Sequence, residues 1–77
     1  MELYTADSKM KARLDNDFTY HAPKDDQVKR FGTLRHDAKL MAGTIVAMTP
    51  PSREQSLALT ALEEAVMWAN AAIARNE

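Results

Sequence analysis

Two long segments with helical apolar spacing, separated by a proline pair, constrain the fold of this chain more than any other feature. Between residues 28 and 48 the apolar positions recur every three or four residues, which is the step that keeps side chains on one face of an α-helix. Pro50 and Pro51 end this segment, because proline cannot continue a helix. The pattern predicts helices over about 24–48 and about 53–75, folded back as an antiparallel hairpin.

The ends of the predicted helices carry capping signals. Pro23 suits the start of the first long helix, and Asp25 and Asp26 place negative charge at the positive end of its dipole. Ser52 and Gln55 have the spacing of a capping box, in which each side chain satisfies a backbone N–H that would otherwise be unpaired. These signals favour an all-α fold.

The segment 1–17 predicts a polar arm with a short helix over about 6–14. Thr5 or Asp7 is the expected cap of this helix, and the Asn16-Asp17 pair is expected to end it. Residues 18–23 are expected to be extended, because the residue before a proline is disfavoured from helical angles.

The whole chain of 77 residues is expected to form a single domain, because a chain this short has room for one core. Aromatic residues make up only 6% of it and there is no cysteine, so neither large aromatic side chains nor disulfides can supply much stability. Between Ser56 and Ala74, 14 of 19 residues are apolar, and such a helix needs cover on more than one side. We therefore expect a homo-oligomer.

Charge and composition exclude several partners. Ten basic and eleven acidic residues give a formal charge of −1, whereas binding to DNA or RNA polymers depends on a marked basic excess. A membrane span over the second long helix is disfavoured because Glu63 and Glu64 stand near its middle. Residues 1–11 lack the apolar core of a signal peptide.

No catalytic or metal centre is predicted. The two histidines, His21 and His36, lie in different elements and lack the one-turn spacing of a zinc motif. Small helical nucleotide pyrophosphatases follow a glutamate pair with another acid one turn later, but Glu63 and Glu64 are followed there by Met67 and Trp68. We therefore expect no enzyme and no cofactor, and interpret the glutamate pair as a packing or inter-subunit ion-pairing feature.

Several residues have the chemistry to bind an anionic, aromatic ligand. Arg35 borders the apolar face of the first long helix and could grip a phosphate, although residue type alone favours a solvated basic face that it shares with Lys29, Arg30 and Lys39. Tyr20 precedes a proline in a non-helical segment, from which a ring can stack on a nucleobase or pin the arm to the hairpin. Arg75 fits the favoured cation position at a helix end, and Trp68 is interpreted as a packing residue.

Taken together, these motifs resemble the bacteriophage anti-CBASS sponge proteins, which share a helical hairpin domain with the phage sponges that counter Thoeris defence. The resemblance covers residues 18–75. It rests on FTYHAP at 18–23, Gln27, Arg30, Leu34-Arg35, PSRE at 51–54, SLALT at 56–60 and LEEAVMWANAAIAR at 62–75. Such proteins are homohexamers that bind cyclic oligonucleotide second messengers and hold them away from defence effectors without cleaving them.

The resemblance implies two binding sites and indicates residues for the first of them. Tyr20 corresponds to a tyrosine that stacks on a base of a cyclic dinucleotide, and Arg35 and Arg75 correspond to basic residues near its phosphates. For a cyclic trinucleotide, Ser52, Arg53 and Ser56 are the candidates, because N–H groups at a helix start attract phosphate. Helix capping is the competing role of the two serines.

The function that follows from this resemblance is a sponge for cyclic di- and trinucleotides such as 3′,3′-cGAMP, acting in the cytoplasm of the infected bacterial host. The alternative is a structural or interaction module that oligomerises and takes no nucleotide. Binding of the ligand by the folded protein distinguishes these two functions.

Overall fold

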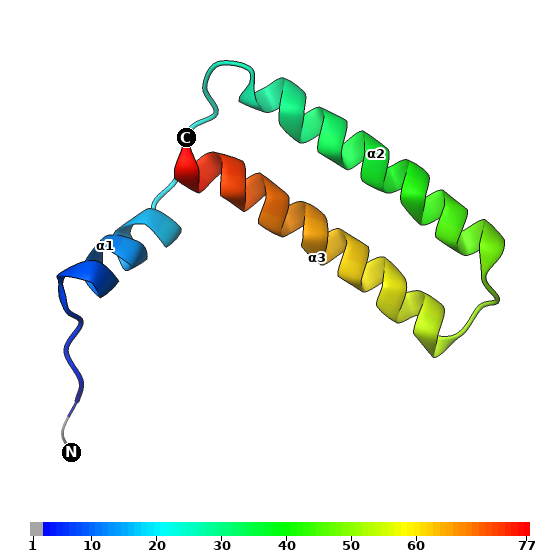
Figure 1. Cartoon of the computed structure of the whole chain (residues 1–77), viewed down its shortest axis with the longest axis horizontal. Helices are drawn as coiled ribbons and strands as arrows, with labels where there is room; N and C mark the ends of the chain where they lie inside the picture. The colour runs from blue at the N-terminus through cyan, green and yellow to red at the C-terminus, as the bar shows by residue number, and fades with distance from the viewer. Residues whose placement is uncertain (1–2) are drawn as a thin grey trace.

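The computed structural model describes residues 3–77, and this part of the chain is all-helical without strands. Helix α1 spans Ser8–Asp17, α2 spans Gln27–Met48 and α3 spans Arg53–Asn76. The last two run antiparallel side by side (Figure 1). This confirms the predicted helical hairpin; residues 1–2 of the predicted arm lie outside the described part.

Helix α1 begins and ends two to three residues later than the sequence predicts. Asp7 caps it by accepting a hydrogen bond from the backbone N–H three residues on, at 2.8 Å. The expectation that Asn16 and Asp17 break the helix is wrong, because their side chains have partners outside the local backbone. Asn16 donates to the backbone oxygen of Arg75 at 3.1 Å, and the Asp17 carboxylate lies 3.7 Å from the Arg75 guanidinium in addition to pairing with Arg13 within the helix at 3.5 Å.

Helix α2 begins at Gln27, three residues later than predicted. Asp25 has φ 52°, a left-handed conformation that is incompatible with a helix starting before it. Two hydrogen bonds between Lys24 and Gln27 close the turn. The backbone N–H of Gln27 donates to the backbone oxygen of Lys24 at 3.0 Å, and the backbone N–H of Lys24 donates to the side-chain oxygen of Gln27 at 3.1 Å. Gln27 is the most deeply buried side chain in residues 3–77, so a polar anchor fixes the start of this helix.

Helix α3 begins with half of the predicted capping box. The hydroxyl of Ser52 accepts from the backbone N–H of Gln55 at 3.1 Å, as expected. The side chain of Gln55 does not return to Ser52; it donates instead to the backbone oxygen and the hydroxyl of Thr49, at 3.1 and 3.0 Å. This glutamine therefore ties the end of α2 to the start of α3 and fixes the hairpin turn.

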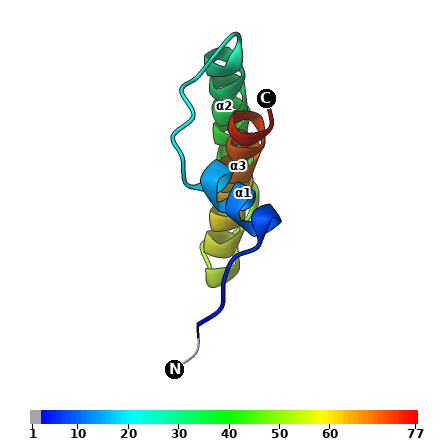
Figure 2. The ribbon, with the colours of Figure 1, turned by 90° about the vertical axis from the view of Figure 1, so that its left-hand side faces the viewer.

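The described chain is a flat plate one helix thick. It measures 50 × 41 × 14 Å, with a radius of gyration of 17.4 Å, where a compact chain of this length would have about 11.5 Å. Figure 2 shows the plate from its edge, with α2 and α3 in line. Its accessible surface of 6662 Å² exceeds the roughly 4,700 Å² of a compact monomer of this mass.

No apolar side chain in residues 3–77 is buried. The cover that the sequence predicts on several sides of α3 comes, within one chain, mainly from α2, and α1 contacts only the end of α3. By length and composition α3 could also cross a membrane, with a mean hydropathy of 1.2, but helices that are covered by protein meet the same criterion. Glu63 and Glu64 stand near its middle, where charge in lipid is costly.

Candidate functional site

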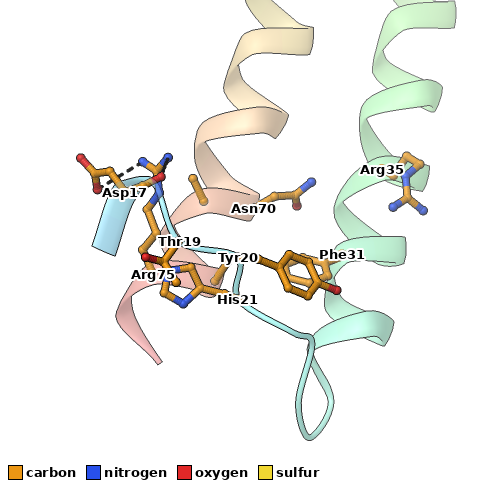
Figure 3. Close-up of a pocket in the computed structure, with 10 residues that line it drawn as sticks. Asp17, Thr19, Tyr20, His21, Phe31, Arg35, Asn70 and Arg75 are labelled. Atoms are coloured by element: carbon orange, nitrogen blue, oxygen red, sulfur yellow. Dashed lines mark hydrogen bonds and ion pairs between the residues drawn. The ribbon is translucent and has the colours of Figure 1, made fainter. Parts of the chain in front are cut away.

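A cavity of about 410 Å³ lies at the open end of the hairpin, opposite the 49–52 turn. One wall is the segment 18–26 between α1 and α2, which we call the strap; α2 and the end of α3 form the others (Figure 3). This strap cavity is lined by Asp17, Thr19, Tyr20, His21, Phe31, Arg35, Asn70, Ala71, Ala74 and Arg75. The fold thus brings Tyr20, Arg35 and Arg75 to one cavity from three different elements.

Tyr20 lies on the strap with 83% of its surface exposed. Its ring extends toward α2 at the level of Phe31, and both side chains line the cavity (Figure 3). The next residue holds the strap in place, because His21 Nε2 lies 2.7 Å from the backbone oxygen of Asn16. A carbonyl only accepts, so this bond places a proton on Nε2. An exposed ring on an anchored backbone is well suited to stacking.

Arg75 lies in the last turn of α3 and faces α1. Its Nη1 is 3.7 Å from a carboxylate oxygen of Asp17, and its Nη2 donates to the backbone oxygen of Asp17 at 3.5 Å (Figure 3). Both contacts are long, and the guanidinium side chain is 32% exposed. A phosphate entering the cavity could therefore take further hydrogen bonds from this group.

Arg35 stands on α2, on the other side of the strap cavity from Arg75 (Figure 3). It forms no ion pair with any residue in the 3–77 range. Arg35 also borders a second, more apolar groove of about 380 Å³ between α2 and α3. The cavity is therefore flanked by two guanidinium groups, one weakly paired and one without an acidic partner.

A polar clasp fixes the other end of the strap, and the sequence analysis did not anticipate it. The Glu77 carboxylate accepts from Arg30, with 2.7 Å between Nη1 and Oε2, and from Gln27 at 3.1 Å. Lys24 Nζ donates to the backbone oxygen of Glu77 at 2.6 Å. Hydrogen bonds from Arg30 and then Gln27 lower the pKa of Glu77 to about 2, and Glu77 raises the pKa of Arg30.

The clasp also changes the interpretation of the basic face on α2. Arg30 is committed to Glu77 and to Asp26, with 3.1 Å between its Nε and the Asp26 carboxylate. It is therefore not a free cation beside Arg35. Opposite charges at the start of α2 and the end of α3 were the signal in the sequence that could have revealed this pairing.

The candidate residues for a trinucleotide, Ser52, Arg53 and Ser56, lie at the other end of α3. Along the helix axis Ser52 is about 35 Å from Arg75, so the fold does not bring this group to the strap cavity. The Ser52 hydroxyl accepts from Gln55 and donates to the backbone oxygen of Pro50 at 3.0 Å. Its capping role thus occupies the hydroxyl within this chain.

The glutamate pair and the tryptophan also lie apart from the strap cavity. Trp68 Nε1 donates to the Glu64 carboxylate at 3.2 Å, and 62% of Trp68 is exposed, so it is not a core residue of a single chain. Within the described range, no three histidine or acidic side chains are grouped closely enough to hold a metal ion. Glu64 therefore positions an exposed indole on the outer surface of α3.

These features define a flat helical hairpin with a ligand-sized cavity at its open end, walled by an aromatic ring and two arginines. A family model described as the Acb2/Tad1 hairpin domain matches residues 10–74. The chain therefore belongs to the Acb2/Tad1 hairpin-domain family, as the resemblance predicts. The match starts inside α1, before the residue 18 at which the resemblance was placed. No curated protein and no solved structure gives a significant match to the chain.

Family membership carries a general function. The Acb2/Tad1 family indicates a sponge-type role against antiphage defence, and its members act by binding, not as enzymes. It also implies that the ligands are cyclic oligonucleotide signals. Because such ligands combine flat bases with anionic phosphates, the composition of the strap cavity is directly relevant to them.

Proposed function

We propose that this protein sequesters cyclic dinucleotides such as 3′,3′-cGAMP in the strap cavity and so blocks CBASS signalling in the cytoplasm of an infected bacterium. The ligand is held intact and is released unchanged. Tyr20 stacks on a base, and Arg35 and Arg75 hold the phosphates.

The observation that carries this proposal is the convergence of Tyr20, Arg35 and Arg75 on one cavity of about 410 Å³. Its size falls within the roughly 300–1,000 Å³ typical of small-molecule pockets. The two arginines supply local positive charge even though the chain carries a net charge of −1. Phosphate binding at such a site needs well-placed guanidinium groups and no general basicity.

The functional form that we propose is a homo-oligomer, most simply the hexamer implied by the family resemblance. The flat plate supports this, because its accessible surface exceeds that of a compact monomer by about 2,000 Å², well above the roughly 800 Å² that each partner buries in a standard stable interface. A cyclic dinucleotide is nearly two-fold symmetric, so a two-fold pair of strap cavities would offer it a tyrosine and two arginines from each subunit.

We further propose that cyclic trinucleotides bind at a separate site that includes Ser52, Arg53 and Ser56. The separation of this group from Arg75 along α3 means that the two ligands need not compete. Within this chain the hydroxyl of Ser52 already caps the helix.

The primary experiment is calorimetric titration of the folded protein with 3′,3′-cGAMP. Tyr20→Ala is expected to weaken binding about tenfold or more, given the roughly 1–3 kcal/mol of base stacking on an aromatic ring. Arg35→Ala is expected to weaken binding and to reduce its salt dependence, because a phosphate contact is lost. Wild-type affinity in both variants would show that the pocket is assigned to the wrong residues.

Matched controls lie on the same chain. Tyr4→Ala removes an exposed tyrosine outside the cavity, and Lys29→Ala removes an exposed cation from α2; both should bind like the unmodified protein. Denaturing the complex should return intact 3′,3′-cGAMP, whereas a cleaved ligand would indicate an enzyme.

The second candidate function is an oligomerisation or docking module without a nucleotide ligand. The apolar groove of about 380 Å³ between α2 and α3 favours it, because Leu59, Leu62 and Val66 line it and are only half-buried. Native mass spectrometry with and without a panel of cyclic oligonucleotides separates the two functions. A stable oligomer that takes up none of these ligands would favour the second.

A further inference from the structure

Asn70 is an unpaired amide in the wall of the strap cavity. Its Oδ1 is shielded from solvent, and no donor within residues 3–77 forms a hydrogen bond with it. Figure 3 shows the side chain pointing from α3 toward α2, between Tyr20 and Arg35. Asn70 therefore stands between the stacking ring and one of the two phosphate-binding candidates.

Each of the other side-chain amides of this chain donates a hydrogen bond within it, and Asn70 Oδ1 is the one shielded side-chain N or O atom in residues 3–77 without a partner. Asn16 donates to the backbone of Arg75, Gln27 to Glu77, Gln55 to Thr49 and Asn76 to the backbone of Ala72. Buried polar atoms in folded proteins normally have a partner, and an unpaired one lowers stability. Asn70 thus departs from a rule that the rest of the molecule follows, and it does so in the cavity wall.

We propose that Asn70 determines the base specificity of the strap cavity by pairing with the edge of an adenine. This inference rests on the proposed function, because it assumes that a base of a cyclic dinucleotide stacks on Tyr20. A carboxamide offers an acceptor beside a donor, and adenine offers the complementary N6–H donor beside the N7 acceptor. The same edge of guanine presents two acceptors, O6 and N7, so the Asn70 oxygen would be left without a donor.

The three kinds of contact then have separate tasks. Stacking on Tyr20 accepts any base, because every base has a flat face. The guanidinium groups of Arg35 and Arg75 bind phosphates that are common to all cyclic dinucleotides. Within this arrangement, the Asn70 amide is the group that distinguishes one base edge from another.

The test compares 3′,3′-cyclic di-AMP with 3′,3′-cyclic di-GMP by calorimetry. The unmodified protein should prefer cyclic di-AMP. Asn70→Leu keeps a similar side-chain volume without hydrogen-bonding groups. It should weaken the binding of cyclic di-AMP about tenfold and leave the affinity for cyclic di-GMP nearly unchanged. The control Asn76→Leu, which removes an amide that is paired within α3, should leave the ligand preference intact.

The outcomes separate this inference from the proposed function. If the unmodified protein binds neither cyclic dinucleotide, the proposed function fails and this inference fails with it. If the unmodified protein binds both ligands, and Asn70→Leu weakens the two affinities equally or changes neither affinity, Asn70 is not a specificity residue. The proposed function would then still stand. If Asn70→Leu does not fold, NMR decides: the Asn70 side-chain amide signals of the unmodified protein must shift with cyclic di-AMP and not with cyclic di-GMP.

Discussion

The exposed tryptophan on α3 offers the sharpest test of whether the flat plate is completed by other subunits. In a single chain 62% of the Trp68 surface is accessible. If the chain worked as a monomer, Trp68→Ala would therefore change the free energy of unfolding only slightly. A fully buried tryptophan removes about 250 Å² from water. Covering the 62% of Trp68 that is accessible in a single chain would therefore remove about 155 Å². At about 25 cal/mol per Å², this is worth up to about 4 kcal/mol per subunit.

The assay combines sedimentation velocity with thermal unfolding at several protein concentrations. If Trp68 is covered in the assembly, Trp68→Ala should dissociate it at micromolar concentration or lower its melting temperature by up to about 15–30 °C. Unfolding of the unmodified protein should shift to higher temperature as concentration rises, because association stabilises the folded state by mass action.

Trp68→Phe is the matched control for this experiment. It retains most of the apolar contact and removes only the 3.2 Å hydrogen bond from Nε1 to Glu64, so the oligomer should persist. A Trp68→Ala variant with the native mass and an unchanged melting temperature would refute the reasoning, since it would show that this side chain stays in water.

Three further predictions concern the ends of the helices. Ser52→Ala should lower the free energy of unfolding by about 1 kcal/mol in denaturant titrations, because the cap of α3 is lost. Asp17→Asn should tighten 3′,3′-cGAMP binding several-fold at low salt, since a phosphate would no longer compete with a carboxylate for Arg75. The pKa of Glu77 falls from its ordinary 4.5 to about 2 in the fold, so its stabilising effect is present above pH 4.5 and lost as pH falls through 2. Glu77→Gln should remove this acid dependence.

Each of these predictions has a distinct contrary result. An unchanged unfolding midpoint for Ser52→Ala would mean that the cap is dispensable. Weaker binding by Asp17→Asn would show that this carboxylate positions Arg75 and does not compete for it. For the clasp, an NMR titration in which Glu77 protonates near 4.5 would contradict its hydrogen bonds from Arg30 and Gln27.

The helical hairpin could be predicted because its signals are local. Apolar spacing, Pro50-Pro51 and the cap at Ser52 each act over a few residues, and the structure confirms the two long helices. The end of α1 could not be predicted in the same way. Asn16 and Asp17 are turn formers in isolation, but here the Asn16 side chain donates to the backbone oxygen of Arg75 and the Asp17 carboxylate pairs with the Arg75 guanidinium, 59 and 58 residues away.

The candidate site was only partly accessible to sequence reasoning. Residue types and the family resemblance selected Tyr20, Arg35 and Arg75, although periodicity alone could not have placed them around one cavity. The clasp depends on a contact between Arg30 and Glu77 across 47 residues, which no local pattern encodes. Asn70 is one of the five non-apolar residues between Ser56 and Ala74, and nothing in the sequence distinguishes it from the others, since its lack of a partner is a property of the folded chain.

The strap is fastened at both ends to the last turn of α3. Asn16 and Asp17 bind Arg75 just before it, and Lys24 and the neighbouring Gln27 bind Glu77 at its far end. With both ends fixed, one inserted residue would add about 3.5 Å of backbone that could only bulge outward, carrying the Tyr20 ring with it. The number of residues in the strap therefore sets the distance between the Tyr20 ring and the two arginines. Relatives with longer or shorter straps should bind cyclic nucleotides of different ring size.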